Sequence, residues 1–190
     1  MTVGSDIFGP GSNFKRRFIE SYDELAQVSD SLKKIGVKVV LVMGTYDLTH
    51  IGHARYLEMA KQPNSIVIIG VDPDKSVQLR KGPNRPLVPE QERLEMLAHL
   101  RHVDLVTLAS DFDEKGIGGY NLIEKVRPDV FVISEMNHYT PEQMIAIKQF
   151  CKEVIIFPQQ AETTTSAKLR LMNIKLVKEA QNRLEDLVNL

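Results

Sequence analysis

Five short apolar runs, separated by stretches of helical periodicity, constrain the fold of this chain more than any other feature of its sequence. The runs are rich in β-branched residues, as buried strands are, and they cover residues 37–43, 65–71, 103–108, 130–133 and 154–157. Apolar residues recur at helical spacing between them, over residues 21–34, 51–61, 89–100, 121–126 and 141–151. Strands that alternate with helices form a parallel sheet with right-handed crossovers. The sequence therefore predicts an α/β fold, a five-stranded parallel sheet with helices on both faces.

The organisation along the chain predicts one domain preceded by an arm. The length of 190 residues suits a single compact domain. We expect a flexible N-terminal arm over residues 1–20, which begins with a stretch rich in Gly, Ser and Pro. The domain is predicted to cover residues 21–190 and to end in a long helix from Ser166 to about Leu187. The segment Asp72–Pro89 is crowded with Asp, Lys, Gly and Pro, and we expect it to be a functional loop.

Composition narrows the classes of partner. A formal net charge of −1 speaks against binding nucleic acid or an anionic membrane through bulk charge. No stretch reaches the length of a membrane span, and the first residues lack the basic and apolar regions of a signal peptide. The lone cysteine, Cys151, excludes an intramolecular disulfide. We therefore expect a cytoplasmic protein with neither a nucleic-acid nor a membrane partner.

The segment Gly44–His53 carries the strongest functional signal, because it follows the first strong strand and opens a helix. Ligands of open α/β sheets bind beyond the carboxyl ends of the strands. His50 and His53 are three residues apart, so both imidazoles can lie on one face of the first helical turn. Gly52 leaves room between them, and the helix N-terminus attracts anions. The segment therefore predicts a pocket for phosphate oxygens.

Two other interpretations of this segment remain. The histidines could be partly buried residues near a helix start, although a pair that flanks a glycine directly after a strand is too specific a context to favour this. Asp47, His50 and His53 could also form a carboxylate–histidine metal site. No further cluster of His or Cys ligands follows in the sequence, so we expect no protein-bound metal.

Residues 44–53 read Gly-Thr-Tyr-Asp-Leu-Thr-His-Ile-Gly-His. They resemble the GxFDxxHxGH signature of the cytidylyltransferase-like nucleotidyltransferase family, also called the HxGH superfamily, with Tyr in place of Phe. The resemblance implies a Rossmann-like sheet of five parallel strands. It implies that His50 and His53 bind the triphosphate and stabilise the transition state. It also assigns nucleotide binding to the rest of the signature: Gly44, Thr45, Tyr46, Asp47 and Gly52.

A second segment, Lys81–Pro86 followed by Arg93, is similar to the family's KGPxRP…ER segment, which supplies phosphate-binding cations. The resemblance implies catalytic roles for Lys81 and Arg93, and less directly for Arg85. Taken alone, the segment is a basic turn, and a solvated loop is the alternative. Local cations are nevertheless needed, because a chain of nearly zero net charge must attract a triphosphate of about four negative charges.

A third segment, residues 163–170, precedes the last helix and resembles the family's ISTTKI or ISSTxxR motif. The hydroxyls of that motif and the helix N-terminus hold the β- and γ-phosphates, although a structural N-cap would also explain them. Ala167 stands where the family usually has Thr, and Gln160 stands where cytidylyltransferases have Arg, which favours ATP over CTP. The match implies four nucleotide-binding residues: Thr165, Ser166, Lys168 and Arg170.

The resemblance extends from Ser21 to Arg170. Within the family it is greatest to heptose 1-phosphate adenylyltransferases, and it also includes glycerol-3-phosphate and choline-phosphate cytidylyltransferases. It departs after the fourth strand, where residues 134–139 read Ser-Glu-Met-Asn-His-Tyr instead of a Gly-Asp segment that holds the acceptor. The acceptor pocket is therefore expected to differ, and we assign Asp72 and Glu135 to it.

These motifs predict a nucleotidyltransferase. It would transfer a nucleoside monophosphate from ATP or CTP, with adenylyl transfer slightly favoured, to a small phosphorylated metabolite and release pyrophosphate. Mg²⁺ is expected to accompany the triphosphate. The alternative is a nucleotide-binding regulatory protein with altered catalysis. A fragment of an aminoacyl-tRNA synthetase would share the His-Ile-Gly-His tetrapeptide, but a KMSKS-like loop and a basic RNA-binding face are missing.

The last helix predicts a homodimer. Four apolar residues recur along it at spacings of three, four and three: Val177, Ala180, Leu184 and Leu187. Such a stripe often packs on its own domain. Here the strands and crossovers are complete before Ser166, so the later turns need another apolar surface, and a two-fold partner is the commonest one.

Overall fold

The computed structural model describes residues 13–135, 139–161 and 165–188. The chain divides into two compact units, Met1–Gln160 and Ala161–Leu190, and each is described by itself. The first unit holds the sheet and the second holds the last helix. The expectation of a single domain over residues 21–190 stays a prediction.

The first unit is built on a parallel sheet of five strands in the order β3-β2-β1-β4-β5. The strands are β1 (Lys38–Gly44), β2 (Ser65–Val71), β3 (Leu105–Leu108), β4 (Val130–Ser134) and β5 (Glu153–Phe157). Each lies within an apolar run of the sequence or extends one residue beyond it. The predicted five-stranded parallel sheet is confirmed.

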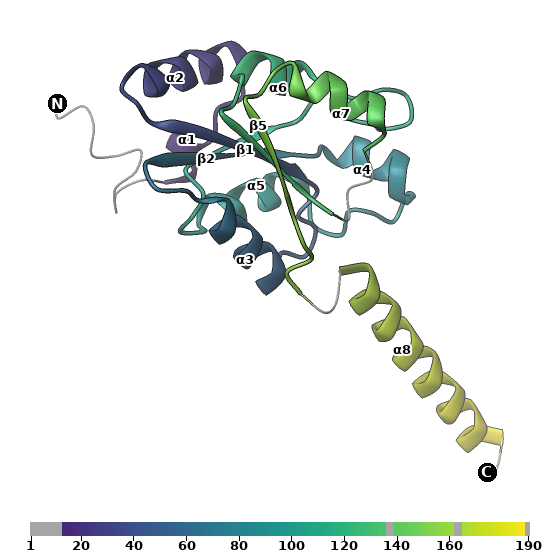
Figure 1. Cartoon of the computed structure of the whole chain (residues 1–190). Coiled ribbons are helices and arrows are strands. Elements are labelled where there is room, and N and C mark those ends of the chain that lie inside the picture. Colours follow the sequence, from purple (N-terminus) through teal and green to yellow (C-terminus); the bar gives the residue numbers. More distant parts are fainter. Residues whose placement is uncertain (1–12, 136–138, 162–164, 189–190) are drawn as a thin grey trace. The chain divides into compact units, whose positions relative to one another are not determined.

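Helices cover both faces of the sheet (Figure 1). One face carries α2 (Tyr22–Lys34), α6 (Asn121–Val126) and α7 (Pro141–Lys148), while the other carries α1 (Phe14–Arg17), α3 (Ile51–Ala60) and α5 (Glu90–Ala98). Alternate residues of β1 enter the two cores, because successive strand side chains point to opposite faces. Val39 and Leu41 pack with Leu25 of α2, whereas Val40 and Val42 pack with Leu57 of α3. The predicted Rossmann-like α/β architecture is therefore confirmed.

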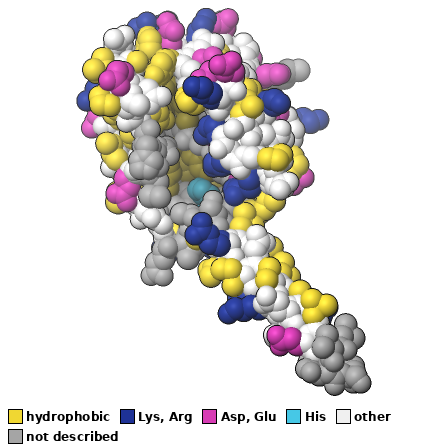
Figure 2. Space-filling model, turned by 90° about the vertical axis from the view of Figure 1, so that its right-hand side faces the viewer, with side chains coloured by type: hydrophobic (Ala, Val, Ile, Leu, Met, Phe, Trp, Pro, Cys, Tyr) yellow, Lys and Arg dark blue, Asp and Glu magenta, His cyan; other side chains and the backbone are white. Residues whose placement is uncertain are grey.

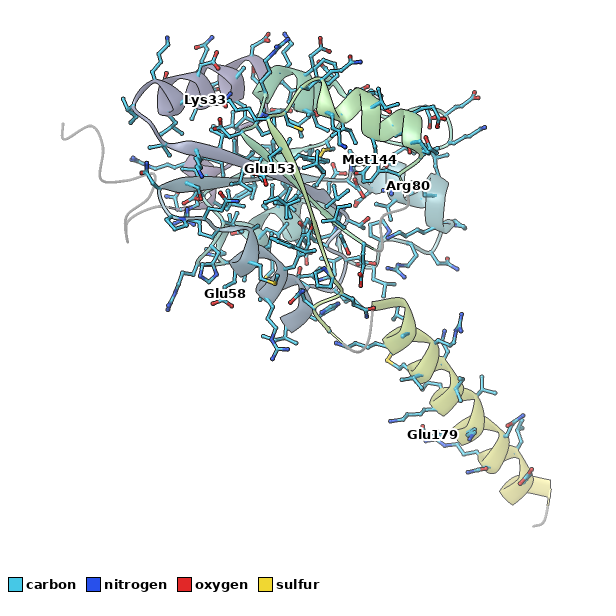
Figure 3. All side chains as sticks on the ribbon, in the orientation of Figure 1. Lys33, Glu58, Arg80, Met144, Glu153 and Glu179 are labelled. Atoms are coloured by element: carbon cyan, nitrogen blue, oxygen red, sulfur yellow. The ribbon has the colours of Figure 1, made fainter. Side chains whose placement is uncertain are left out.

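Local sequence signals set both ends of α2. The Ser21 hydroxyl accepts a hydrogen bond from the backbone N–H of Glu24 at 3.3 Å, which caps the first turn. The helix ends at Lys34, and Gly36 follows with a φ of 83°, as the sequence predicts. Lys33, labelled in Figure 3, donates to the carbonyl oxygens of Val126 and Arg127 at 2.9 and 2.7 Å. This contact ties α2 to the end of α6.

The structure differs from the prediction between residues 72 and 89. Part of this segment is a helix, α4 (Asp74–Lys81), which begins after Pro73. Gly82 follows the helix as its C-cap and has a φ of 94°. A Glu90 side-chain oxygen accepts from the backbone N–H of Asp74 at 2.7 Å and so satisfies one of the unpaired donors of the helix start. Only two residues of α4, Ser76 and Val77, are buried. Its sequence therefore shows almost no apolar periodicity.

Part of the segment expected to be an arm is held to the domain. Phe14 and Phe18 stack with ring centroids 5.5 Å apart and pack on the core next to α5. Arg17 donates to the carbonyl oxygens of Ala98 and Val103 at 2.8 and 3.0 Å. The backbone N–H of Ile19 donates to Val106 at 3.0 Å. Residues 14–19 thus form an anchored segment beside β3.

The second unit is the single helix α8 (Thr165–Val188). Its large apolar side chains are exposed within that unit; they are Leu171, Met172, Ile174, Leu176, Val177 and Leu184. Glu179, labelled in Figure 3, is one of the charged residues on the same helix. None of the described helices combines the length and the apolar character needed to cross a membrane.

Candidate active site

The sheet has its topological switch point at β1, which lies between β2 and β4. From β1 the chain continues outward to β2 and β3, and it then returns to the other side of β1 as β4 and β5. Ligands of open α/β sheets bind at this point, beyond the carboxyl ends of the strands. Figure 2 shows a hollow in the surface with a histidine at its lower end and several Lys and Arg side chains along one side.

The turn after β1 is tight and places the Tyr46 ring against Gly44. Tyr46 and Leu48 both have left-handed backbone conformations, with φ of 55° and 50°. A Cβ atom at Gly44 would lie 3.2 Å from Cε2 of Tyr46, which is closer than packed side chains normally approach. Tyr46 is 5% exposed, and its ring meets the His53 ring edge-on at 5.3 Å between centroids. It therefore supports His53 from the core side.

His50 and His53 form a reciprocal cap at the start of α3. Nδ1 of His50 accepts from the backbone N–H of Gly52 at 3.0 Å, and Nδ1 of His53 accepts from the backbone N–H of His50 at 3.3 Å. The two rings lie 4.1 Å apart. The two histidines therefore cap the helix, and this cap has a chemical consequence.

That consequence concerns which ring nitrogen carries the proton. Because Nδ1 of each imidazole accepts a backbone N–H, a neutral ring must carry its hydrogen on Nε2. Both Nε2–H groups are then donors, fixed by the same contacts that cap α3. Two donors held in place beside a helix N-terminus suit the binding of phosphate oxygens. They also suit stabilisation of the negative charge that develops on those oxygens in the transition state.

Asp47 anchors the segment that follows α4. It is 3% exposed, and its carboxylate accepts from Nε of Arg85 at 2.8 Å and from the backbone N–H groups of Leu87 and Val88 at 3.0 and 3.1 Å. Burial raises the pKa of this carboxyl, but these hydrogen bonds and the Arg85 charge bring the pKa below its ordinary value. Asp47 was predicted to bind nucleotide; in this structure its carboxylate orients the loop that carries Arg85.

Asp47→Asn tests this anchoring role. An amide offers the loop N–H groups one acceptor and one mismatched donor, so we expect a loss of about 1–3 kcal/mol in the free energy of unfolding at pH 7. The contribution of a carboxyl with a lowered pKa is present above its unfolded value of about 3.8 and is lost as the pH falls through the folded value. The difference between the two proteins in urea denaturation should therefore shrink below pH 4. An equal difference in the free energy of unfolding between the two proteins at pH 3 and pH 7 would contradict the anchoring role of the carboxylate.

Arg93 was predicted to bind phosphate, but the structure buries it. The side chain is 1% exposed. Its guanidinium donates to the carbonyl oxygens of Val88, Thr45 and Asp72, and it pairs with the Asp74 carboxylate at 2.6 Å. These contacts join the ends of β1 and β2 to α4. Arg93 is thus placed to position the site, and the structure does not bring its guanidinium to the surface where a phosphate would bind.

Lys81 lies beside the turn after β1. Its Nζ donates to the Thr45 hydroxyl at 3.3 Å, and that hydroxyl donates to the Asp72 carboxylate at 2.7 Å. Lys81 is an exposed residue, yet desolvation by the surrounding groups and the nearby charges of Arg80 and Arg85 lower its pKa. The backbone N–H of Asp72 also donates to Gly44, so the two strand ends are tied together.

The remaining predicted residues follow β4 in the chain. The side chain of Glu135 accepts from the backbone N–H of Gln159 at 2.8 Å and thereby links the ends of β4 and β5. The Gln160 amide donates to Pro158. Lys168 and Arg170 lie on α8 in the second unit, as do Thr165 and Ser166. Residues 136–138 and 162–164 lie outside the described part of the chain.

Sequence reasoning missed Arg80. It lies on α4, which was expected to be a loop, and pairs with the Asp72 carboxylate. The signal in the sequence is the adjacent pair Arg80-Lys81 at the end of a polar stretch, which becomes informative only once that stretch is recognised as a helix.

Comparisons with known proteins find a matching family and several relatives. The family described as cytidylyltransferase-like matches residues 41–162, more than half of the chain. A bifunctional protein HldE from a Nitratiruptor species is 38% identical over 60% of this chain and 24% of its own length. A bifunctional protein HldE from Geobacter metallireducens is 38% identical over 67% of this chain and 24% of its own length. The chain therefore spans about a quarter of these relatives.

A solved structure shows the same fold. The crystal structure of the lipopolysaccharide core biosynthesis protein from Thermoplasma volcanium has a TM-score of 0.56 at 20% identity, and the match covers 66% of this chain and all of that one. An identity this low supports the architecture of the sheet and helices alone.

Proposed function

The chain belongs to the cytidylyltransferase-like family of nucleotidyltransferases, and on that premise we propose that it transfers a nucleoside monophosphate from ATP or CTP to a small phosphorylated metabolite. A phosphate oxygen of the acceptor attacks the α-phosphorus in line. The bond from that phosphorus to the bridging oxygen breaks, and pyrophosphate leaves with the electron pair. Positioning and stabilisation of charge carry most of such a reaction.

The observation that carries this proposal is the reciprocal cap of His50 and His53. Both Nδ1 atoms accept backbone N–H groups at the start of α3, which leaves Nε2 of each ring as the donor. Donors fixed in advance lose little free energy to reorganisation when charge develops on the α-phosphate and the leaving group. Lys81 beside Thr45 supplies a positive charge next to the same turn. Lys168 and Arg170 are proposed to add cations from α8.

Mg²⁺ is proposed to accompany the triphosphate. Within the described residues, no three His, Cys, Asp or Glu side chains group as a metal site. This fits Mg²⁺, which usually keeps several waters and binds through substrate phosphates with one or two carboxylates. When bound, it would neutralise part of the triphosphate charge. The cations of the chain then need to offset only the remainder.

The second candidate function is a regulatory protein that binds a nucleotide without turning it over. The motivating observation is that Glu135, assigned to the acceptor, holds Gln159 in this structure. Pyrophosphate release from ATP or CTP in the presence of phosphorylated metabolites separates the two functions. Release that depends on such a metabolite supports the enzyme. Nucleotide binding without any release supports the regulatory protein.

We expect ATP to bind more tightly than CTP. Gln160 replaces the Arg of cytidylyltransferases, and its side-chain amide is already engaged by Pro158. Titration calorimetry with each nucleotide measures the preference directly, with GTP as a reference for non-specific binding of triphosphates. A tenfold preference for CTP would reverse this assignment.

A homodimer is also proposed, with α8 in the interface. Val177 and Leu184 are 56% and 62% exposed within their unit, and an exposed apolar stripe of this kind favours association. Light scattering should give twice the 21.5 kDa of one chain, and Leu184→Glu should shift the mass toward the monomer. Lys178→Glu, on the polar side of the same helix, is the matched control. A monomeric wild-type protein at micromolar concentration rules the dimer out.

A further inference from the structure

Arg80 lies in the site but has no role in the function proposed above. Its guanidinium, labelled in Figure 3 on α4, pairs with the Asp72 carboxylate that follows β2. The same carboxylate oxygen accepts from the Thr45 hydroxyl at 2.7 Å. Lys81, the next residue of α4, donates to that hydroxyl at 3.3 Å. Two adjacent cations of one helix turn therefore meet at one hydroxyl–carboxylate pair beside the end of β1.

The two cations differ in their partners. Lys81 donates to a neutral hydroxyl, whereas the charge of Arg80 is balanced by Asp72. The Arg80 and Asp72 side chains are 32% and 17% exposed, and ion pairs open to water contribute little to stability. Asp72 keeps the Thr45 hydrogen bond if Arg80 turns away. The pair can therefore open while the Asp72 carboxylate keeps one hydrogen-bond donor.

The Tyr139 phenol interacts electrostatically with the same charged groups. It follows β4, yet its phenol lies within electrostatic reach of Asp72 and Arg80. Burial, more than the Asp72 charge, raises the pKa of Tyr139 to about 12, while Arg80 opposes the rise. In the sheet order β1 lies between β2, which precedes Asp72, and β4, which precedes Tyr139.

We propose that Arg80 binds the phosphate of the acceptor, a phosphomonoester, and that Asp72 positions the guanidinium until the acceptor arrives. This inference rests on the proposed function. The planar guanidinium can bind two phosphate oxygens at once. Lys81, one residue further, remains for the triphosphate, so neighbouring residues of α4 bind the two reacting groups. Asp72 is then free to accept a hydrogen bond from a hydroxyl of the acceptor.

Calorimetry with methyl phosphate tests the proposal, because this probe carries only the phosphomonoester. The protein is first saturated with α,β-methylene ATP, which fills the nucleotide site and is not cleaved. We expect Arg80→Gln to weaken methyl phosphate binding about tenfold or more, and to change the affinity for the ATP analogue less than twofold. Arg80→Lys should give an intermediate loss. Lys75→Gln, an exposed residue on the same helix, removes one positive charge and should change neither affinity.

Three results would overturn the proposal. Methyl phosphate binding that is absent from the wild type, or that Arg80→Gln leaves unchanged, removes the phosphate role. An equal loss of both affinities in Arg80→Gln assigns the residue to the nucleotide site instead. Failure of the wild type to bind any nucleotide is a different result, since it overturns the proposed function together with the inference.

Discussion

His50→Asn is expected to lower turnover about 10²–10³-fold while leaving the free energy of unfolding nearly unchanged. Asn is among the best N-cap residues, so its side-chain oxygen can replace Nδ1 as the acceptor for the N–H of Gly52. It cannot supply the donor at Nε2, because the amide is shorter than the imidazole. The substitution therefore separates the capping role of His50 from its proposed role in catalysis. Steady-state kinetics and urea denaturation of the same preparation measure the two effects.

His99→Asn is the matched control, since this histidine is largely exposed on the surface next to Glu95. It should change neither turnover nor stability. His50→Ala, by contrast, should lose both the catalytic donor and about 0.5–2 kcal/mol of capping stabilisation. Near wild-type turnover in the double variant His50→Asn with His53→Gln would show that the pair caps α3 and takes no part in catalysis.

Arg93→Met is expected to destabilise the ligand-free protein by about 3–5 kcal/mol. The substitution removes the donors of three carbonyl oxygens and leaves Asp74 without its buried partner. Methionine fills most of the volume of the arginine stem, so the loss reports chiefly on these polar contacts. For a chain of this length the melting temperature should fall by about 6–20 °C.

Arg101→Met provides the comparison for Arg93, because Arg101 is exposed and should cost less than about 0.5 kcal/mol. Measuring ligand-free stability and nucleotide affinity together distinguishes the two possible roles of Arg93. A positioning residue lowers stability in the absence of ligand, whereas a phosphate ligand lowers nucleotide affinity and leaves the free protein intact. Unchanged ligand-free stability with weakened ATP binding would restore the role expected from the family resemblance.

The sheet could be predicted from sequence because its strands are short, apolar and rich in β-branched residues. In the run from Lys38 to Gly44, four central residues are completely buried, and burial on both faces produces a continuous apolar pattern. The turn after it could be predicted because Gly44 ends the strand, and His50 and His53 follow at a spacing that fits one helical turn. The local sequence pattern was sufficient to predict an element wherever burial or backbone geometry alone selects the residue type.

The helix α4 could not be predicted in this way. It buries only Ser76 and Val77, so its sequence carries no apolar stripe, and the flanking Pro73 and Gly82 are typical of loops. The helix is held by contacts from outside the segment, in particular from Glu90 and Arg93. Tertiary contacts thus override a weak local preference.

The role of each charged residue, either ligand contact or positioning, also depends on contacts distant in sequence. Asp47 accepts from Leu87 and Val88, and Arg93 donates to Thr45. Motif similarity identifies these residues as belonging to the site, but burial decides which of them can meet a ligand. Lys81 stays beside the open turn while Arg93 lies behind it. Arg80 enters the site only because α4 brings it to Asp72.

Nucleotidyl transfer itself is tested most directly by measuring both products of one reaction. The protein is incubated with ATP, Mg²⁺ and either a panel of phosphorylated metabolites or a deproteinised cell extract, while pyrophosphate is quantified enzymatically and the new nucleotide ester is identified by mass spectrometry. We predict pyrophosphate and an AMP-linked acceptor in equal amounts, only when an acceptor is present, and about 10²–10³-fold more slowly in His50→Asn. Tight ATP binding with no pyrophosphate from any acceptor, or equal rates in the two proteins, would contradict this account.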